Sequence, residues 1–165
     1  MAFNSNIPFF LPVSAATTTL GANDGQVGMK ITYEGEDYVL AYNGCTAQAL
    51  PGNIVALSAS TNYSFVLTSV TNAGAAFGAV KHSTIAASNY GWVLVRGYAD
   101  LINGMAGTAP ANGDIIELAA DGKFAKANTI LATGSAGLPF GIVQSAGASG
   151  GTGASKSYCF IKTLG

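Results

Sequence analysis

The sequence predicts an all-β protein: a single β-barrel or β-sandwich domain, built from two similar halves and preceded by an extended N-terminal arm. Three observations support this prediction. Short runs rich in Val, Ile, Tyr and Phe alternate with turn dipeptides, namely Asn43-Gly44, Asn103-Gly104, Asn112-Gly113 and Asp121-Gly122. No stretch shows a convincing i, i+3, i+4 spacing of apolar residues, which would indicate a helix. Blocks of sequence also recur in the two halves.

The predicted arm covers residues 1–26. Pro8 and Pro12 lack a backbone N–H and favour extended conformations in the residues before them. The arm is apolar without any period, and its apolar side chains are candidate interface residues, namely Phe3, Ile7, Phe9, Phe10 and Leu11. These side chains either pack along their own domain or reach a neighbouring subunit, and the sequence leaves both arrangements open.

The predicted β domain covers residues 27–165 and begins with a hairpin. Residues 29–42 read MKITYEGEDYVLAY, with a two-residue alternation on both sides of the turn at 34–37. The final strand is expected at residues 157–163, where Tyr158, Phe160 and Ile161 would complete the core.

The similar halves span about residues 29–80 and 91–143. Three pairs of blocks carry the similarity: 37–41 with 91–95, 52–59 with 113–120, and 73–80 with 136–143. The third pair keeps the frame Ala-Gly-x-x-Phe-Gly-x-Val. We therefore expect Phe77 and Phe140 to anchor the core of their halves, and Trp92 to lie in a central strand. The halves should close into one barrel or pack as a sandwich, because a half alone would leave strand edges unpaired.

The chain carries little charge. Seven Lys and Arg against eight Asp and Glu give a net charge of -1, and only 9% of residues are charged, compared with about 25% in typical domains. Nucleic acid and anionic membranes are therefore not expected as partners. No apolar stretch approaches the roughly 18 residues of a membrane span, and no secretory signal pattern is found. A surface of this kind favours contact with other protein.

No constellation of residues predicts catalysis, a metal or a cofactor, so we expect a protein that is not an enzyme. His82 is the only histidine and no nucleophile motif accompanies it. The carboxylates of Glu34, Glu36 and Asp37 share one hairpin turn, which indicates a solvated loop. The glycine-rich segment 147–153 lacks the Lys and the following helix of a phosphate-binding loop.

The two cysteines, Cys45 and Cys159, lie far apart and show no metal-binding spacing. We expect free thiols. A single long-range disulfide is the alternative if the protein meets an oxidising environment.

Several segments in a fixed order resemble the capsid decoration proteins, also called cement or head accessory proteins, of tailed bacteriophages. They are VGMKITYEGEDYVLAYNG, ALPGNIVAL, GWVLVRGYADL, GDIIELAADGKFAKA, FGIV and SYCFIKT. The resemblance covers most of the chain and rests on strand order, so no family residue is carried over individually. It implies a structural protein of the virion without an active site, which binds the outer capsid surface as a homotrimer. Its partner would be the major capsid protein, whose capsomers it bridges and stabilises.

Two other functions stay open. The first is a receptor- or glycan-binding knob of a virion fibre or a surface adhesin, with exposed aromatic residues as stacking platforms; the candidates are Tyr42, Tyr63, Tyr90, Trp92 and Tyr98. The second is a small hydrolase, which would require His82 to lie near a serine or a carboxylate.

Overall fold

The computed structural model describes residues 11–21, 25–58, 63–67, 76–104, 109–127, 139–147 and 155–163. Within these ranges the regular structure is almost entirely β, with one short 3-10 turn, η1 (Ala120–Gly122), and no α-helix. The predicted all-β fold is confirmed, and it contains a closed barrel.

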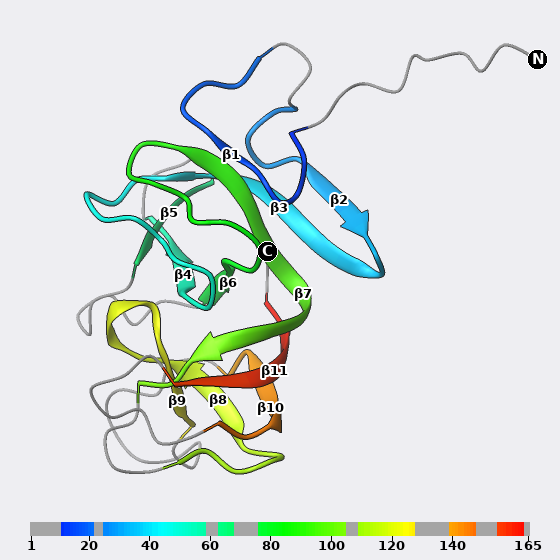
Figure 1. Ribbon diagram of the computed structural model, residues 1–165, viewed down its shortest axis with the longest axis vertical. Helices are drawn as coiled ribbons and strands as arrows, with labels where there is room; N and C mark the ends of the chain where they lie inside the picture. The colour runs from blue at the N-terminus through cyan, green and yellow to red at the C-terminus, as the bar shows by residue number, and fades with distance from the viewer. Residues whose placement is uncertain are drawn as a thin grey trace, which may run out of the picture.

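The first barrel consists of five strands: β3 (Glu36–Asn43), β4 (Ile54–Leu57), β5 (Ser64–Leu67), β6 (Ala76–Ala79) and β7 (Tyr90–Ile102). The order around the barrel is β3-β5-β4-β6-β7, and β7 pairs again with β3 (Figure 1). All neighbours are antiparallel except β3 and β5. Two further strands join this barrel from the N-terminal side. β2 (Lys30–Tyr33) forms the predicted hairpin with β3, and β1 (Ala16–Thr17) pairs with β7.

The second barrel repeats this plan in the other half of the chain. β8 (Ile115–Leu118), β9 (Phe124–Lys126), β10 (Gly141–Ser145) and β11 (Lys156–Lys162) follow β7 in the order β7-β11-β10-β8-β9. A parallel bridge between Asn103 and Phe124 connects β9 back to the end of β7. Among the described residues, each barrel therefore has one parallel contact, and it falls at the same step in both. Each half closes its own ring, rather than the two halves closing one common barrel.

The long strand β7 belongs to both barrels. Its first part pairs with β3 and its second part pairs with β11. Between the two parts the strand passes Gly97, whose φ is +145°. A Cβ at this position would lie 2.8 Å from Cγ of Glu36. Glycine is therefore required where the strand leaves the first barrel and enters the second.

Two of the three repeated blocks occupy equivalent places in the barrels. Val55 faces Gly78 across β4 and β6, as Ile116 faces Gly141 across β8 and β10. The block pair 37–41 and 91–95 does not occupy equivalent places, because these two segments pair with each other inside the first barrel. The topology instead makes β3 equivalent to the second part of β7, so the turn Asn43-Gly44 corresponds to Asn103-Gly104. In both turns the glycine N–H donates to a phenylalanine carbonyl, Phe65 or Phe124.

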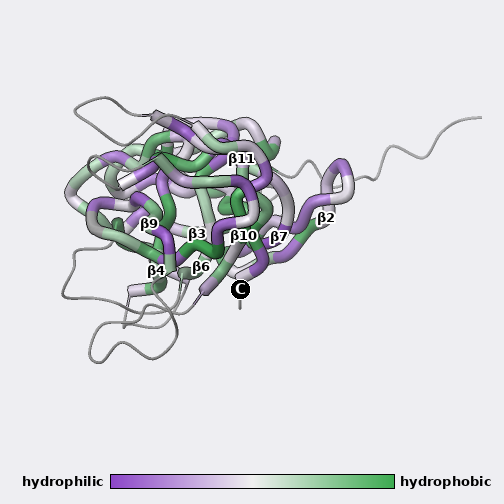
Figure 2. The backbone as a smooth tube through the Cα atoms, turned by 90° about the horizontal axis from the view of Figure 1, so that it is seen from below, coloured by the Kyte–Doolittle hydropathy of each residue, from purple (hydrophilic) through white to green (hydrophobic). Residues whose placement is uncertain are grey.

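Each barrel has its own apolar interior, and eight positions match one to one. The first barrel contributes Val39, Ala41, Val55, Phe65, Phe77, Val80, Val93 and Val95. The second contributes Ala99, Leu101, Ile116, Phe124, Phe140, Val143, Cys159 and Ile161. Figure 2 shows hydrophobic stretches gathered in the interior, whereas the tip of the β2–β3 hairpin is hydrophilic. The repeat in the sequence is thus a repeat of inward-facing positions.

Candidate interaction surface

The outside of the second barrel carries a continuous row of apolar side chains. Tyr98 faces Phe160 across β7 and β11, Phe160 faces Ile142 on β10, and Ile142 faces Ile115 on β8. Tyr98, Ile142 and Ile115 are 41%, 42% and 46% exposed, and Phe160 is half-buried. We call these four residues the outer row. It crosses four adjacent strands, so the strands hold it as a rigid, uncharged surface.

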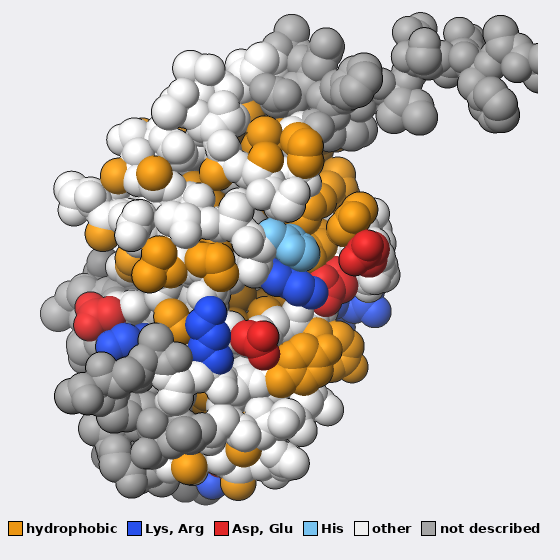
Figure 3. All heavy atoms as spheres, in the orientation of Figure 1, with side chains coloured by type: hydrophobic (Ala, Val, Ile, Leu, Met, Phe, Trp, Pro, Cys, Tyr) orange, Lys and Arg blue, Asp and Glu red, His pale blue; other side chains and the backbone are white. Residues whose placement is uncertain are grey.

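Aromatic contacts extend the outer row along β11. The ring of Tyr158 stacks on that of Tyr98, with centroids 5.4 Å apart and an interplanar angle of 9°. Phe160 lies tilted against the same tyrosine at 5.1 Å. Tyr158 is itself 44% exposed. Figure 3 shows a patch of hydrophobic side chains at the level where β7 bends, while the charged side chains of that face gather in a band across its middle.

The equivalent outer positions of the first barrel are buried. They are Tyr38, Leu94, Ala79, Ile54 and, in place of Tyr158, Trp92, all of which are at most 3% exposed. Residues of the N-terminal segment, among them Leu11, Val13 and Leu20, belong to or pack against the same cluster. The two halves of β7 reflect this difference. Residues 91–95 are buried on both faces, whereas residues 96–101 alternate between exposed and buried.

The structure places the predicted arm and core residues as follows. Leu11 is buried within its own chain, and its carbonyl accepts a hydrogen bond from Nε1 of Trp92 at 2.7 Å. At this residue the arm therefore packs along its own domain. Phe77 and Phe140 are buried in the two barrel interiors, and Trp92 is buried on the outer side of the first barrel. The other candidate interface residues, Phe3, Ile7, Phe9 and Phe10, lie outside the described residues.

Sequence reasoning missed the outer row. It assigned Tyr158 to the core, but Tyr158 is exposed and only Ile161 of the three expected core residues in the last strand is fully buried. The signal was present in the order Ser157, Tyr158, Cys159, because a buried small residue precedes and follows the tyrosine. A two-residue alternation places such a tyrosine on the opposite face from its neighbours.

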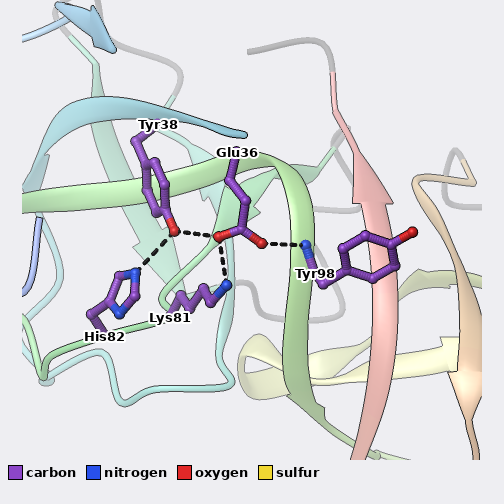
Figure 4. A network of polar contacts seen from close by, with 5 residues as sticks. All are labelled: Glu36, Tyr38, Lys81, His82 and Tyr98. Atoms are coloured by element: carbon purple, nitrogen blue, oxygen red, sulfur yellow. Dashed lines mark hydrogen bonds and ion pairs between the residues drawn. The ribbon is translucent and has the colours of Figure 1, made fainter. Parts of the chain in front are cut away.

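The clearest polar cluster lies where the two barrels join (Figure 4). The carboxylate of Glu36 accepts hydrogen bonds from the hydroxyl of Tyr38 at 2.6 Å, from Nζ of Lys81 at 2.5 Å and from the backbone N–H of Tyr98 at 2.9 Å. The hydroxyl of Tyr38 also lies 2.9 Å from Nε2 of His82. Because the single proton of this hydroxyl goes to Glu36, Nε2 of His82 must be the donor in the second contact.

The pKa values in this cluster keep it in one charge state near neutral pH. Burial alone would raise the pKa of Glu36, but hydrogen bonds from Lys81, Tyr38 and the Tyr98 N–H outweigh it, and the pKa lies below its ordinary value. Burial and the Glu36 charge raise the pKa of Tyr38. Burial and the nearby Lys81 lower the pKa of His82, which favours the neutral ring. The carboxylate is occupied by three donors from its own chain, so the cluster ties the joint together.

A shallow groove of about 380 Å³ lies beside this joint. Its basic residues are Lys30, Arg96 and Lys162, and Asp37 lies among them. A hydrogen bond from Thr32 and the ion pair with Arg96 at 3.3 Å lower the pKa of Asp37. Ion pairs this exposed contribute little to stability.

The described residues hold no group of three or more His, Cys, Asp or Glu side chains placed to bind a metal ion. None of the helical structure described in this chain is long and apolar enough to cross a membrane. Cys45 and Cys159 are not joined to each other, and burial raises the pKa of Cys159 to about 12.

No known protein-family model matches the chain, and no curated protein matches it significantly.

Proposed function

We propose that the chain is a structural virion protein of the capsid decoration type. It binds the outer surface of a tailed-phage capsid and stabilises the lattice by bridging copies of the major capsid protein, acting as a homotrimer and not as an enzyme. The observation that carries this proposal is the outer row, whose four members are apolar and come from four adjacent strands.

The chemistry of the outer row suits a contact with protein. Stacked and tilted aromatic rings supply a large area with few side-chain torsions to immobilise, and such residues dominate the energy of many protein interfaces. The low charge of the whole chain agrees with this role, because binding then depends on apolar burial rather than on ion pairs. The shared strand β7 joins the barrels into one body, which fits a protein that spans a seam between capsomers.

The test uses capsids of the phage that encodes the chain, prepared without this protein. Co-sedimentation should persist from low salt to about 1 M NaCl, since apolar burial is not screened whereas exposed charges are screened beyond about 8 Å at physiological salt. Adding the protein should raise the temperature at which the capsids rupture. Binding that collapses in moderate salt, or capsids that rupture at the same temperature with and without the protein, would contradict the proposal.

Variants connect the test to the outer row. Replacing two aromatic anchors, Tyr98→Ser with Tyr158→Ser, should weaken capsid binding about tenfold or more, because a central aromatic anchor typically contributes over about 1 kcal/mol. The matched control is Tyr33→Ser with Leu57→Ser. These side chains are 46% and 48% exposed and lie outside the outer row, so their loss should leave capsid binding unchanged.

A glycan-binding knob is the second candidate, and the exposed pair Tyr98 and Tyr158 favours it. Flat aromatic rings in water are surfaces on which sugar rings stack, and Tyr98 is one of the platform residues expected from the sequence. Soluble oligosaccharides should then compete with binding to cells, and capsid stability should not depend on the protein.

A further inference from the structure

We infer that the outer row is the docking site for residues 1–10 of a second copy of this chain. This inference goes beyond the proposed function and does not require a capsid. It combines the equivalence of the two barrels with the attachment and composition of the N-terminal segment.

In the first barrel the equivalent residues are buried, and the N-terminal segment contacts one of them, Trp92, through Leu11. Leu11, Val13 and Leu20 belong to or pack against one apolar cluster, which joins these residues to the interior of the second barrel. The contact is specific as well as apolar, because Trp92 donates a hydrogen bond to the carbonyl of Leu11. Trp92 holds the position that Tyr158 holds in the second barrel.

In the part of the chain that the structure describes, no equivalent segment lies before the second barrel. β7 passes without interruption from the first barrel into the second, so no stretch of chain precedes the second barrel as residues 11–20 precede the first. The two barrels have equivalent outer faces. A segment that covers the outer row of the second barrel therefore has to come from another part of the chain or from another molecule. An exposed apolar surface of this kind commonly marks an interaction site.

Leu11 is held on the first barrel by Trp92, so residues 1–10 are attached at the covered barrel and not at the outer row, which makes a second copy the occupant that we propose. A turn closed by the N–H of Ala15 and the carbonyl of Pro12 precedes β1, which runs antiparallel to β7. β1 therefore runs away from the second barrel.

The composition of residues 1–10 matches the outer row. The segment MAFNSNIPFF contains Phe3, Ile7, Phe9 and Phe10 and no charged side chain. The outer row likewise contains no charged side chain, so docking on these four residues would bury mainly apolar groups, with the exposed Asp100 opposite Tyr158 at its border. Pro8 favours an extended backbone in the residue before it, which suits packing along a sheet face.

Docking of this kind is head-to-tail, because the arm of one copy meets the second barrel of the next. Head-to-tail contacts form closed rings when the rotation allows it. A three-membered ring would provide the homotrimer proposed above.

The experiment measures molar mass by light scattering after size exclusion, at several concentrations. The full chain should form a closed oligomer. Deleting residues 1–10 and, separately, replacing Tyr98→Ser with Tyr158→Ser should each yield a folded monomer. The control Tyr33→Ser with Leu57→Ser should remain oligomeric. A synthetic peptide of residues 1–10, added to the deleted chain, should shift the NMR signals of Tyr98, Ile142 and Ile115.

Three results would overturn the inference. The first is a full chain that stays monomeric at millimolar concentration. This result would count against the inference both if Tyr98 is exposed and if its own arm covers it. Another is an oligomer that survives deletion of residues 1–10. The third is a peptide that leaves the signals of the outer row unchanged. Salt-resistant capsid binding by a monomeric chain would leave capsid decoration standing without the homotrimer, with the major capsid protein as the occupant of the outer row.

Discussion

Tyr38 on β3 and Tyr98 on β7 occupy equivalent places in the two barrels, but Tyr38 is 1% exposed whereas Tyr98 is 41% exposed. The two tyrosines face Leu94 and Phe160 of the adjacent strands. The hydroxyl of Tyr38 is bound between Glu36 and His82. Two copies of one structural plan therefore differ in whether their outer face is exposed, and this difference marks the candidate interaction surface.

Phe77→Ala and Phe140→Ala should destabilise the protein by similar amounts. Both side chains are at most 5% exposed, and they fill equivalent places in the two interiors. Truncating a buried Phe to Ala leaves a cavity and costs about 3–5 kcal/mol. Urea unfolding curves of the two variants would measure this loss. A variant that unfolds like the wild type would show that its barrel does not depend on this anchor.

Gly97→Ala should be more destabilising than Gly113→Ala. Both glycines have positive φ, +145° and +85°, so both substitutions strain the backbone by about 1–3 kcal/mol. A Cβ at Gly97 would also lie 2.8 Å from Glu36, whereas a Cβ at Gly113 would meet nothing within 4 Å. Melting temperatures of the two variants give the comparison. Equal losses would mean that Glu36 moves away at no cost.

Acid should weaken the joint between the barrels. The pKa of Glu36 lies below its ordinary value of 4.5, so the folded state binds this proton less readily than the unfolded state does. The contribution of Glu36 is therefore complete above about pH 4.5 and is lost as the pH falls through the lower folded pKa. Glu36→Gln should be less stable than wild type at pH 7, and this difference should shrink below pH 4.5. A difference that is constant with pH would contradict the prediction.

Protonation of His82 should also destabilise the folded protein, and it should do so at a higher pH than protonation of Glu36. Its pKa is lowered from 6.5, so the unfolded state binds this proton more readily and stability should decrease as the pH falls below about 6.5. The variant His82→Asn should lack this part of the pH dependence while keeping the loss below pH 4.5. Thermal unfolding between pH 8 and pH 3 would separate the two contributions.

The two thiols should differ in reactivity. Cys159 is fully buried and its pKa is raised to about 12, whereas Cys45 is half-buried, with its Sγ accepting a hydrogen bond from the Leu67 N–H at 2.8 Å. Since the thiolate is the reactive form, Cys159 should not react with a thiol reagent in the folded protein. Both thiols should react after unfolding in guanidinium chloride. Finding no thiol in the unfolded protein would indicate a disulfide instead.

The sequence was informative wherever a local pattern determines the structure. The hairpin of β2 and β3 and the inward-facing Phe77 and Phe140 follow from alternation and turn residues. The block pair 37–41 and 91–95 misled, because residues 38–41 and 91–95 are buried on both faces and therefore have similar apolar sequences. Their similarity reflects a shared environment within the first barrel and not equivalent positions.

The candidate surface could not be predicted in the same way. Tyr38 and Tyr98 are the same residue type at equivalent places, and the burial of Tyr38 goes with a long-range contact, that of its ring with His82. The Glu36 cluster also depends on long-range contacts, since Lys81 and His82 lie more than forty residues from their partners. The sequence showed these residues only as a solvated turn and a lone histidine.

The most direct test of the interaction surface is a cryo-EM map of the assembled phage particle that carries this protein. We expect the chain on the outer capsid surface, bridging capsomers, with its outer row covered by residues 1–10 of a neighbouring copy. Tyr98, Phe160, Ile142 and Ile115 should then all lie in a protein contact. A map in which these four side chains face solvent, or in which the chain is absent from the capsid surface, would contradict the proposed role.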